Sequence, residues 1–472
     1  MPGRRPEWNA VVPIAALAVV FVASRLAVAS AGVRFDASTL GWFWQYLDPE
    51  LLRNDLAESL LYLHAQPPLF NLLLGMALKV APEHWAQVLH GVFLVASAAG
   101  AVGGYLLLLR LGLSRPIAAA IIAVGLVSPA WLLYENWLFY EHLVAMALIL
   151  AGLALHRHLA SPSVGRSIVF FTLVAGVVLT RSLFHPVWLV VVLALVVLSD
   201  LGAWRMTAIG AAVPYAMVAL VIAKNLVLFG VPGTTSWTGS NLAKVTVEGV
   251  PLEERRELVA RGVLSPVSLV RPFSSIEEYA VVVAPPPATG VAALDGLRKP
   301  PTGVPNFNHS SMIGVSDLYL GDAWATVRTH PSAYAEALVE GVKVFARPST
   351  AYDFLLSNRA SIASYDRAVS NYVFLRGGEW SPTILVAYLL SLLYGALLLA
   401  RARRTAGRTG AALGTLLFLW VTIVWIAGVA NLTELGENHR FRYLSDALVV
   451  VLLAYAAHRA YAKLSPGPDR AV

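Results

Sequence analysis

Carboxylates gather in one polar stretch near the N-terminus, residues 33–84. Asp36 follows an apolar segment by only a few residues, which would hold its carboxylate at a membrane surface. A partly buried carboxylate in that position can accept a proton from a hydroxyl group, so Asp36 is a candidate general base. Asp48, Asp55 and Glu58 lie further along the stretch, where a solvated loop charge or a helix cap explains each of them more simply.

Two prolines stiffen the end of the same stretch. The segment His-Ala-Gln-Pro-Pro begins at His64 and contains Gln66, and because proline fixes its own φ angle, the backbone there orients both side chains rigidly. This rigidity indicates a binding site. The stretch also carries the aromatic residues Trp42, Trp44 and Tyr46. These fit either an interfacial aromatic belt or stacking against a sugar ring.

Ionisable residues also occur where a later apolar segment begins. Glu135 lies in a polar turn, and Glu141 and His142 fall inside the start of the apolar segment that follows it. Ionisable groups at such positions are costly and usually face the protein interior or a cavity. Contact with a substrate is the functional interpretation, while a structural hydrogen-bonding role stays open.

Arginines lie at the corresponding ends of other apolar segments. Arg181 separates two of them, and Glu437, Arg440 and Arg442 immediately precede the last one. Guanidinium groups bind phosphate through two parallel hydrogen bonds. Carboxylates and cations on one membrane surface therefore indicate an anionic lipid substrate.

The elements that must position these residues are membrane-spanning helices. Hydrophobic residues make up 57% of the 472 positions and charged residues 13%, against roughly 25% charged in soluble domains. About 20 apolar residues are needed to cross the hydrocarbon core. We predict an all-α polytopic membrane protein whose spanning helices lie at residues 10–32, 85–110, 115–134, 137–157, 165–182, 184–201, 205–228, 382–401, 410–431 and 443–462.

The orientation follows from clusters of Lys and Arg, which mark cytoplasmic loops and account for the net charge of +7 without nucleic acid. Both termini are then cytoplasmic, the first helix is retained rather than cleaved, and residues 33–84 and 229–381 lie outside. Residues 68–80 are too short to span and are predicted as an interfacial helix. The predicted location is the cell membrane, with the active site extracytoplasmic.

Three parts follow from this topology. Residues 1–228 form an N-terminal transmembrane core with a catalytic first outer loop, residues 229–381 an extracytoplasmic insertion of mixed short elements, and residues 382–472 the C-terminal helices and a cytoplasmic tail. Within the insertion, helical spacing of apolar residues from Pro331 to Phe345 predicts an amphipathic helix. The absence of cysteine excludes disulfides and thiolate catalysis.

These features together resemble the GT-C glycosyltransferases, in particular the branch of the protein O-mannosyltransferases and the lipid A aminoarabinose transferase. The resemblance rests on Asp36, on the acidic turn before the fourth helix, on Arg181, and on two short motifs. The motifs are His-x-Gln-Pro-Pro-Leu-Phe from His64 and Glu-x-x-Arg-Phe-Arg-Tyr from Glu437. The sequence departs from the family's pattern where Ala37 replaces the second acid of an Asp-Glu pair and where Ala65-Gln66 interrupts a His-Pro-Pro run.

The resemblance implies inverting transfer of a sugar from a polyprenyl-phosphate donor to a glycan, lipid or protein acceptor. Asp36 would act as the base and Glu141 as a second acid, while Arg181, Arg440 and Arg442 would hold the phosphate. His64 and Gln66 would line the sugar pocket, with Glu135, His142 and Glu437 as further substrate contacts.

No metal or other cofactor is required by this scheme, although a divalent ion stays possible. Two alternatives stay open. A lipid-linked sugar transporter would show internal repeats or broken helices, and we find neither in the sequence. An inactive scaffold of the same fold would tolerate the loss of Asp36.

Overall fold

The structure is a computed structural model that describes residues 8–375, 379–405 and 409–464. Every regular element in these ranges is an α-helix or a 3-10 helix, and the only strand-like pairings are two isolated bridges. Long apolar runs favour helices in lipid because a helix satisfies its backbone hydrogen bonds internally.

Within the described residues, seven helices are long and apolar enough to cross a membrane. They are α1 (Trp8–Ser30), α5 (Trp85–Arg110), α8 (Glu141–Ala160), α11 (Trp204–Phe229), α20 (Pro382–Arg403), α21 (Ala411–Thr433) and α22 (Asn438–Leu464). The bent pair α6 (Arg115–Val127) and α7 (Pro129–Glu135) makes an eighth if it counts as one span. The remaining predicted spans, α9 (Val164–Thr180) and α10 (Pro186–Ser199), are helices of 17 and 14 residues, so the number ten stays a prediction.

The pair α6 and α7 is bent by 58° at Ser128. Pro129 disfavours helical backbone at the residue before it, and the Ser128 side chain accepts a hydrogen bond from the Trp131 N–H as the cap of α7. Our expectation that the chain contains no broken helix is therefore wrong at this point. The break leaves Glu135 at the end of a short helix inside the protein.

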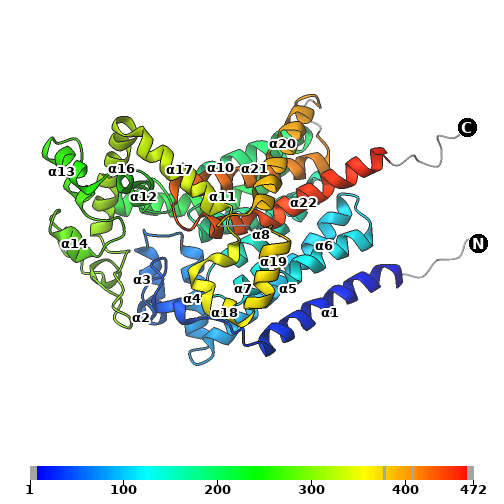
Figure 1. Cartoon of the computed structure of the whole chain (residues 1–472), viewed down its shortest axis with the longest axis horizontal. Coiled ribbons are helices and arrows are strands. Elements are labelled where there is room, and N and C mark those ends of the chain that lie inside the picture. The colour runs from blue at the N-terminus through cyan, green and yellow to red at the C-terminus, as the bar shows by residue number, and fades with distance from the viewer. Residues whose placement is uncertain (1–7, 376–378, 406–408, 465–472) are drawn as a thin grey trace, which may run out of the picture.

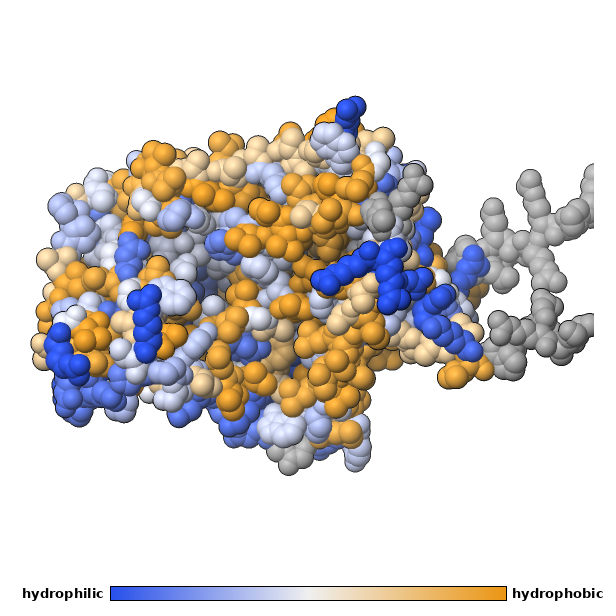
Figure 2. Space-filling view, turned by 90° about the horizontal axis from the view of Figure 1, so that it is seen from above, coloured by the Kyte–Doolittle hydropathy of each residue, from blue (hydrophilic) through white to orange (hydrophobic). Residues whose placement is uncertain are grey.

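Helix α8 forms the centre of the bundle, because it packs against α5, α9, α21 and α22. Helix α1 packs mainly against α6 and leaves most of its surface exposed. Hydrophobic residues also cover much of the face in Figure 2, as a lipid-facing surface requires. Exposed examples are Val213 and Leu220 on α11 and Leu393 on α20.

The first polar stretch, residues 33–84, folds into short helices that pack against the bundle. These are η1 (Ser38–Gly41), α2 (Pro49–Asn54), α3 (Leu56–Leu61) and α4 (Pro68–Val80). The predicted helix at 68–80 is confirmed as α4, which packs against α2, α5 and α9.

The regular elements of the insertion's described residues are all helices, joined by irregular segments and one isolated bridge between Arg298 and Pro305. Its α-helices are α12 (Thr238–Val245), α13 (Leu252–Ala260), α14 (Ile276–Ala280), α15 (Ala292–Asp295), α16 (Ser311–Thr329), α17 (Pro331–Phe345), α18 (Leu356–Ser361) and α19 (Ala363–Tyr372). The predicted amphipathic helix is confirmed as α17. Helices α12, α13, α14 and α16 lie at the end of the molecule opposite the start of α1 and the last turns of α22 (Figure 1), and we call this the insertion end.

Candidate functional site

A cavity of about 610 Å³ opens at the insertion end. The first polar stretch, α12, the turn between α9 and α10, and the turn between α21 and α22 surround it. Its charged lining residues are Arg181, Lys244, Glu434, Glu437 and Arg440, and its aromatic ones include Trp42, Trp44, Trp237, Phe273, Phe354 and Trp425. We call it the charged cavity.

Two arginines of this cavity share one buried carboxylate. Glu141, the first residue of α8, is fully buried, and the Arg181 guanidinium donates a hydrogen bond to its Oε1. Arg440 Nη1 lies 3.0 Å from the same oxygen. Both arginines are 2% exposed. Glu141 therefore lies behind the lining and holds the two cations in place.

The remaining charges pair across the two turns. Arg440 Nη2 donates to Glu437 Oε2 at 2.5 Å, and Glu437 Oε1 accepts the Tyr352 hydroxyl at 2.8 Å. Lys244, from the insertion, donates to Glu434 Oε1 at the end of α21. With Arg181 and Glu141, these residues make three cations and three carboxylates, so the cluster is neutral when all six are ionised.

A close helix contact positions Lys244. A Cβ atom on Gly239 of α12 would lie 1.8 Å from the Ser316 carbonyl oxygen of α16, so only glycine allows these helices to pack this closely. The Gly239 N–H also donates to Ser316 Oγ at 3.1 Å. The packing of α12 on α16 thus positions Lys244 beside Glu434 at the end of α21.

Several buried donors of the cluster have no hydrogen-bond partner among the described residues. They are Arg181 Nε and Arg440 Nε, whereas Arg440 Nη1 has the ion-pair contact with Glu141 described above. A buried N–H without a partner costs about 1–3 kcal/mol, so such groups usually meet a ligand or ordered water. Across the described ranges, no group of three or more His, Cys, Asp or Glu side chains is arranged to hold a metal ion. The free donors suit an anion.

The two carboxylates of the α21–α22 turn differ in acidity. Burial raises the pKa of Glu434 above its ordinary value, and the single Lys244 cation offsets this only in part. Burial acts in the same direction on Glu437, but Arg440, Lys244 and the Tyr352 hydroxyl outweigh it and lower the pKa of Glu437. Two neighbouring acids with opposite shifts suit different roles in proton transfer.

Aromatic rings form the opposite wall of the charged cavity. Trp44 stacks on Phe273 with ring centroids 5.5 Å apart, and Phe273 adopts a left-handed φ of 62°. Such a backbone conformation is strained for a bulky side chain and persists where the surroundings require it. Trp42 and Trp44 remain 56% and 42% exposed, so part of each side chain is available to a ligand.

Glu135 and His142 belong to a different, interior network. Arg25 of α1 donates to Glu135 through Nε at 3.0 Å and Nη2 at 2.6 Å. His142 bonds Ser97 Oγ at 3.2 Å and the Tyr443 hydroxyl at 2.8 Å. The structure does not bring either residue to the charged cavity. Their contacts fit the structural role that the sequence left open.

Arg442 also points away from the cavity. It is 1% exposed, donates to Ser349 Oγ at 2.6 Å, and lies 3.3 Å from Asp446. Arg440 faces the cavity instead, because residues two apart on a helix lie roughly 200° apart around its axis. Of the two arginines in the motif, the structure therefore brings only Arg440 to the site.

Gln66 lines the charged cavity, but His64 does not. His64 is fully buried, and its ring nitrogens bond Ser236 Oγ at 2.8 Å and the Asn308 carbonyl oxygen at 2.9 Å. Asn308 also accepts the His64 backbone N–H at 2.9 Å. His64 thus joins the first polar stretch to the insertion.

This burial makes stability depend on pH. Burial lowers the pKa of His64 to about 3, so the folded protein holds it neutral while the unfolded chain protonates it near 6.5. We expect its contribution to be complete above about pH 6.5 and to decline by about 1.4 kcal/mol per pH unit below that. Thermal unfolding of purified protein between pH 7.5 and 4.5 measures this. His64→Asn should flatten the pH dependence relative to the native chain, and an unchanged slope would refute the assignment.

Asp36 is half-buried beside the turn that precedes α8. Its carboxylate accepts the Ser38 N–H at 3.0 Å and the Ser38 hydroxyl at 2.6 Å. Its backbone forms a parallel bridge with Trp137, in which the Asp36 N–H donates to the Asn136 carbonyl at 2.8 Å. The bridge joins the first polar stretch to the turn before α8. Asp36 is not among the residues that line the charged cavity.

Sequence reasoning missed Lys244, Glu434 and Phe273. Glu434 had a usable signal, because it ends an apolar helix three residues before Glu437, where an ionisable group commonly faces a cavity. Lys244 and Phe273 had none, because their positions depend on how the insertion folds back.

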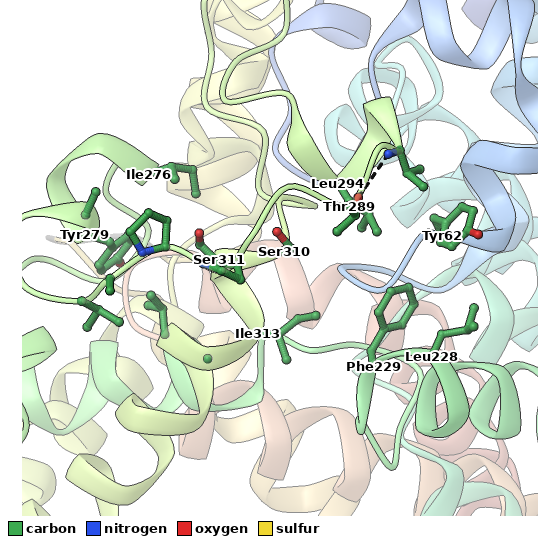
Figure 3. A pocket seen from close by; sticks show the side chains of 18 residues that line it. Tyr62, Leu228, Phe229, Ile276, Tyr279, Thr289, Leu294, Ser310, Ser311 and Ile313 are labelled. Atoms are coloured by element: carbon green, nitrogen blue, oxygen red, sulfur yellow. Dashed lines mark hydrogen bonds between the residues drawn. The ribbon is translucent and has the colours of Figure 1, made fainter.

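A second cavity, of about 620 Å³, lies between the end of α11 and the helices α14 and α16. Figure 3 shows Leu228 and Phe229 on its α11 side and Thr289, which accepts a hydrogen bond from Val291, on the insertion side. Its lining contains no acidic, basic or histidine side chain. This second cavity therefore offers no charged side chain for catalysis.

Fold and site together define a class: an all-α, multi-pass membrane protein with a buried charge cluster at one end of its helix bundle. No family model, curated protein or solved structure matches this chain.

Proposed function

We propose that this protein transfers a sugar from a polyprenyl-phosphate donor to an acceptor hydroxyl or amine, with inversion, at the outer face of the cytoplasmic membrane. The observation that carries the proposal is the pair Arg181 and Arg440, which line the charged cavity and each carry a buried Nε–H group with no hydrogen-bond partner among the described residues. Guanidinium donors held in a low-dielectric site bind phosphate strongly.

Lipid access supports a lipid-linked donor. Helices α10 and α21 pack together and both contribute to the cavity rim, through His185 just before α10 and through Trp425 and Val429 of α21. The same helices expose Val187 and Val424. A polyprenyl chain could thus lie in the bilayer along α10 and α21 while its phosphate reaches the arginines.

The aromatic wall supports a sugar as the transferred group. Trp42 and Trp44 line the cavity and are partly exposed, and Gln66 adds an amide at the same cavity. Sugar rings stack on aromatic faces and hydrogen-bond to amides. We place the sugar between this wall and the phosphate site.

The chemistry requires a base on the acceptor and cations on the phosphate, because the phosphate leaving group needs little protonation. Arg181 and Arg440 would stabilise the charge that develops on the phosphate. No step of this scheme needs a metal ion. Asp36, the base that the resemblance implies, lies outside the cavity lining, so its role is tested directly.

The test is sugar transfer by purified protein in nanodiscs, from a panel of polyprenyl-phosphate sugars to a panel of amine and hydroxyl acceptors. We expect one donor class to yield a product of inverted anomeric configuration. Asp36→Asn, assayed in parallel, should abolish transfer and spare donor binding if Asp36 is the base.

A transporter is the second candidate, because the 58° bend between α6 and α7 resembles the broken helices of transporters. At that break the Ser128 side chain accepts the Trp131 N–H, and Ser128 lines neither cavity described above. Movement of a fluorescent polyprenyl-phosphate sugar across proteoliposomes, without transfer to any acceptor, would favour transport and overturn our proposal.

A further inference from the structure

We propose that the ion pair between Lys244 and Glu434 is the proton acceptor of the transfer reaction, and that Lys244 then neutralises the departing phosphate. The inference rests on the proposed function and names the residues that complete it. It also gives the insertion a role in catalysis, because Lys244 is supplied by α12.

The geometry leaves one oxygen of Glu434 available. Its Oε1 accepts hydrogen bonds from Lys244 Nζ and, at 3.1 Å, from the Leu435 N–H. No hydrogen bond to its Oε2 is found among the described residues. Both partners line the charged cavity. An acceptor hydroxyl or amine in the cavity can therefore reach Oε2 without first displacing the lysine.

The other carboxylates are held more firmly. Glu141 is bound by two arginines and lies behind the lining, and Glu437 is bound by Arg440 and by the Tyr352 hydroxyl. Asp36 does not line the cavity. Glu434 has a single cation as its partner, and burial raises its pKa, so it is the lining carboxylate most ready to take a proton.

The reaction balances in atoms and charge. The acceptor oxygen or nitrogen forms a bond to the anomeric carbon of the sugar, the bond from that carbon to the phosphate oxygen breaks, and its electron pair leaves with the polyprenyl phosphate. The acceptor's proton passes to Glu434 Oε2. The phosphate gains one negative charge, and Glu434 loses one.

This charge shift gives Lys244 its second role. The cluster of three cations and three carboxylates is neutral before reaction, so a donor phosphodiester brings one net negative charge to the cavity. When Glu434 is protonated, its ion pair with Lys244 is lost, and the ammonium is free for the more highly charged phosphate monoester. Proton transfer and stabilisation of the leaving group are thereby coupled through one pair.

The pH dependence has a defined sign. The charged groups around Glu434 are Lys244 of α12, Glu437 of the turn and Arg440 of α22. Glu434 must be deprotonated to act as a base, so transfer should fall as pH drops through its raised pKa. Removing Lys244 takes away the cation that lowers this pKa. The acidic limb of the pH–rate profile, the range in which transfer falls as pH drops, should therefore move to higher pH.

The experiment compares Glu434→Gln, Lys244→Met and Asp36→Asn, with Glu340→Gln as the control. Glu340 pairs with Lys343 on the exposed face of α17, so its loss should change nothing. For Glu434→Gln we expect a fall of about 100-fold or more in single-turnover transfer, with unchanged donor affinity. For Lys244→Met we expect slower transfer and an acidic limb displaced to higher pH.

Two results would overturn the inference while leaving the proposed function intact. One is normal transfer by Glu434→Gln, and the other is an acidic limb that disappears in Asp36→Asn and persists in Glu434→Gln. If Glu434→Gln does not fold, the pH–rate profile of Lys244→Met provides the test. An acidic limb at the same pH as in the native chain would refute the coupling. No transfer by the native chain with any donor overturns the proposed function and this inference together.

Discussion

Glu141→Ala is expected to destabilise the protein by about 3–5 kcal/mol, the usual cost of removing one partner from a buried ion pair. The reason is that Arg181 and Arg440 both depend on this one carboxylate, and both are almost completely buried. Without it, Arg181 has no carboxylate partner among the described residues, and Arg440 keeps only Glu437. The expected effect is a large fall in the midpoint of thermal unfolding in detergent.

A second substitution shows whether charge or packing causes the loss. Adding Arg181→Met to Glu141→Ala removes the cation that has lost its carboxylate partner, so the double variant should be more stable than Glu141→Ala alone. Glu340→Ala, which breaks an exposed pair on α17, serves as the matched control and should cost about 1 kcal/mol or less. A Glu141→Ala protein as stable as this control would show that the arginines do not depend on Glu141.

Arg440→Gln should weaken binding of a polyprenyl-phosphate donor by between about 30-fold and several thousandfold, since truncating a buried, charged hydrogen-bond partner costs about 2–5 kcal/mol. Arg440 lines the cavity, and its buried Nε–H has no hydrogen-bond partner within the part of the chain that the structure describes. Its loss removes the guanidinium that we assign to the phosphate. Titration of the variant in nanodiscs with a fluorescent donor measures the change.

Arg442→Gln is the matched control, because Arg442 is as deeply buried as Arg440 on the same helix but faces Ser349 and Asp446. We expect it to lower stability and to leave the donor affinity of the folded protein unchanged. Arg347→Gln, at an exposed pair with Glu379, controls for net charge. Equal loss of donor affinity in Arg440→Gln and Arg442→Gln would contradict the assignment of Arg440, and not Arg442, to the phosphate site.

The sequence was sufficient for the elements whose determinants are local. Apolar runs and helical spacing predicted most of the long helices, and they located α4 and α17 with the bounds that the structure has. They also identified the turn before α8, where Glu141 begins the helix. These features follow from hydrophobic periodicity and from proline at helix starts, which act over a few residues.

The bend at Ser128 was missed although its cause is local. A serine followed by proline is a helix-boundary signal, but the apolar residues on both sides suggested one continuous span. Hydrophobicity shows that a segment avoids water, and it does not show that the segment is straight.

Which candidate residues meet was decided by the tertiary structure alone. The sequence predicted that ionisable groups at the helix ends avoid lipid, but it could not show that Glu141 pairs with Arg181 and Arg440 while Glu135 pairs with Arg25. Lys244 and Glu434 are 190 positions apart and meet only because the insertion folds back over the membrane core. Local chemistry determines what each side chain can do, and long-range packing determines its partner, because no short-range pattern records a contact between distant segments.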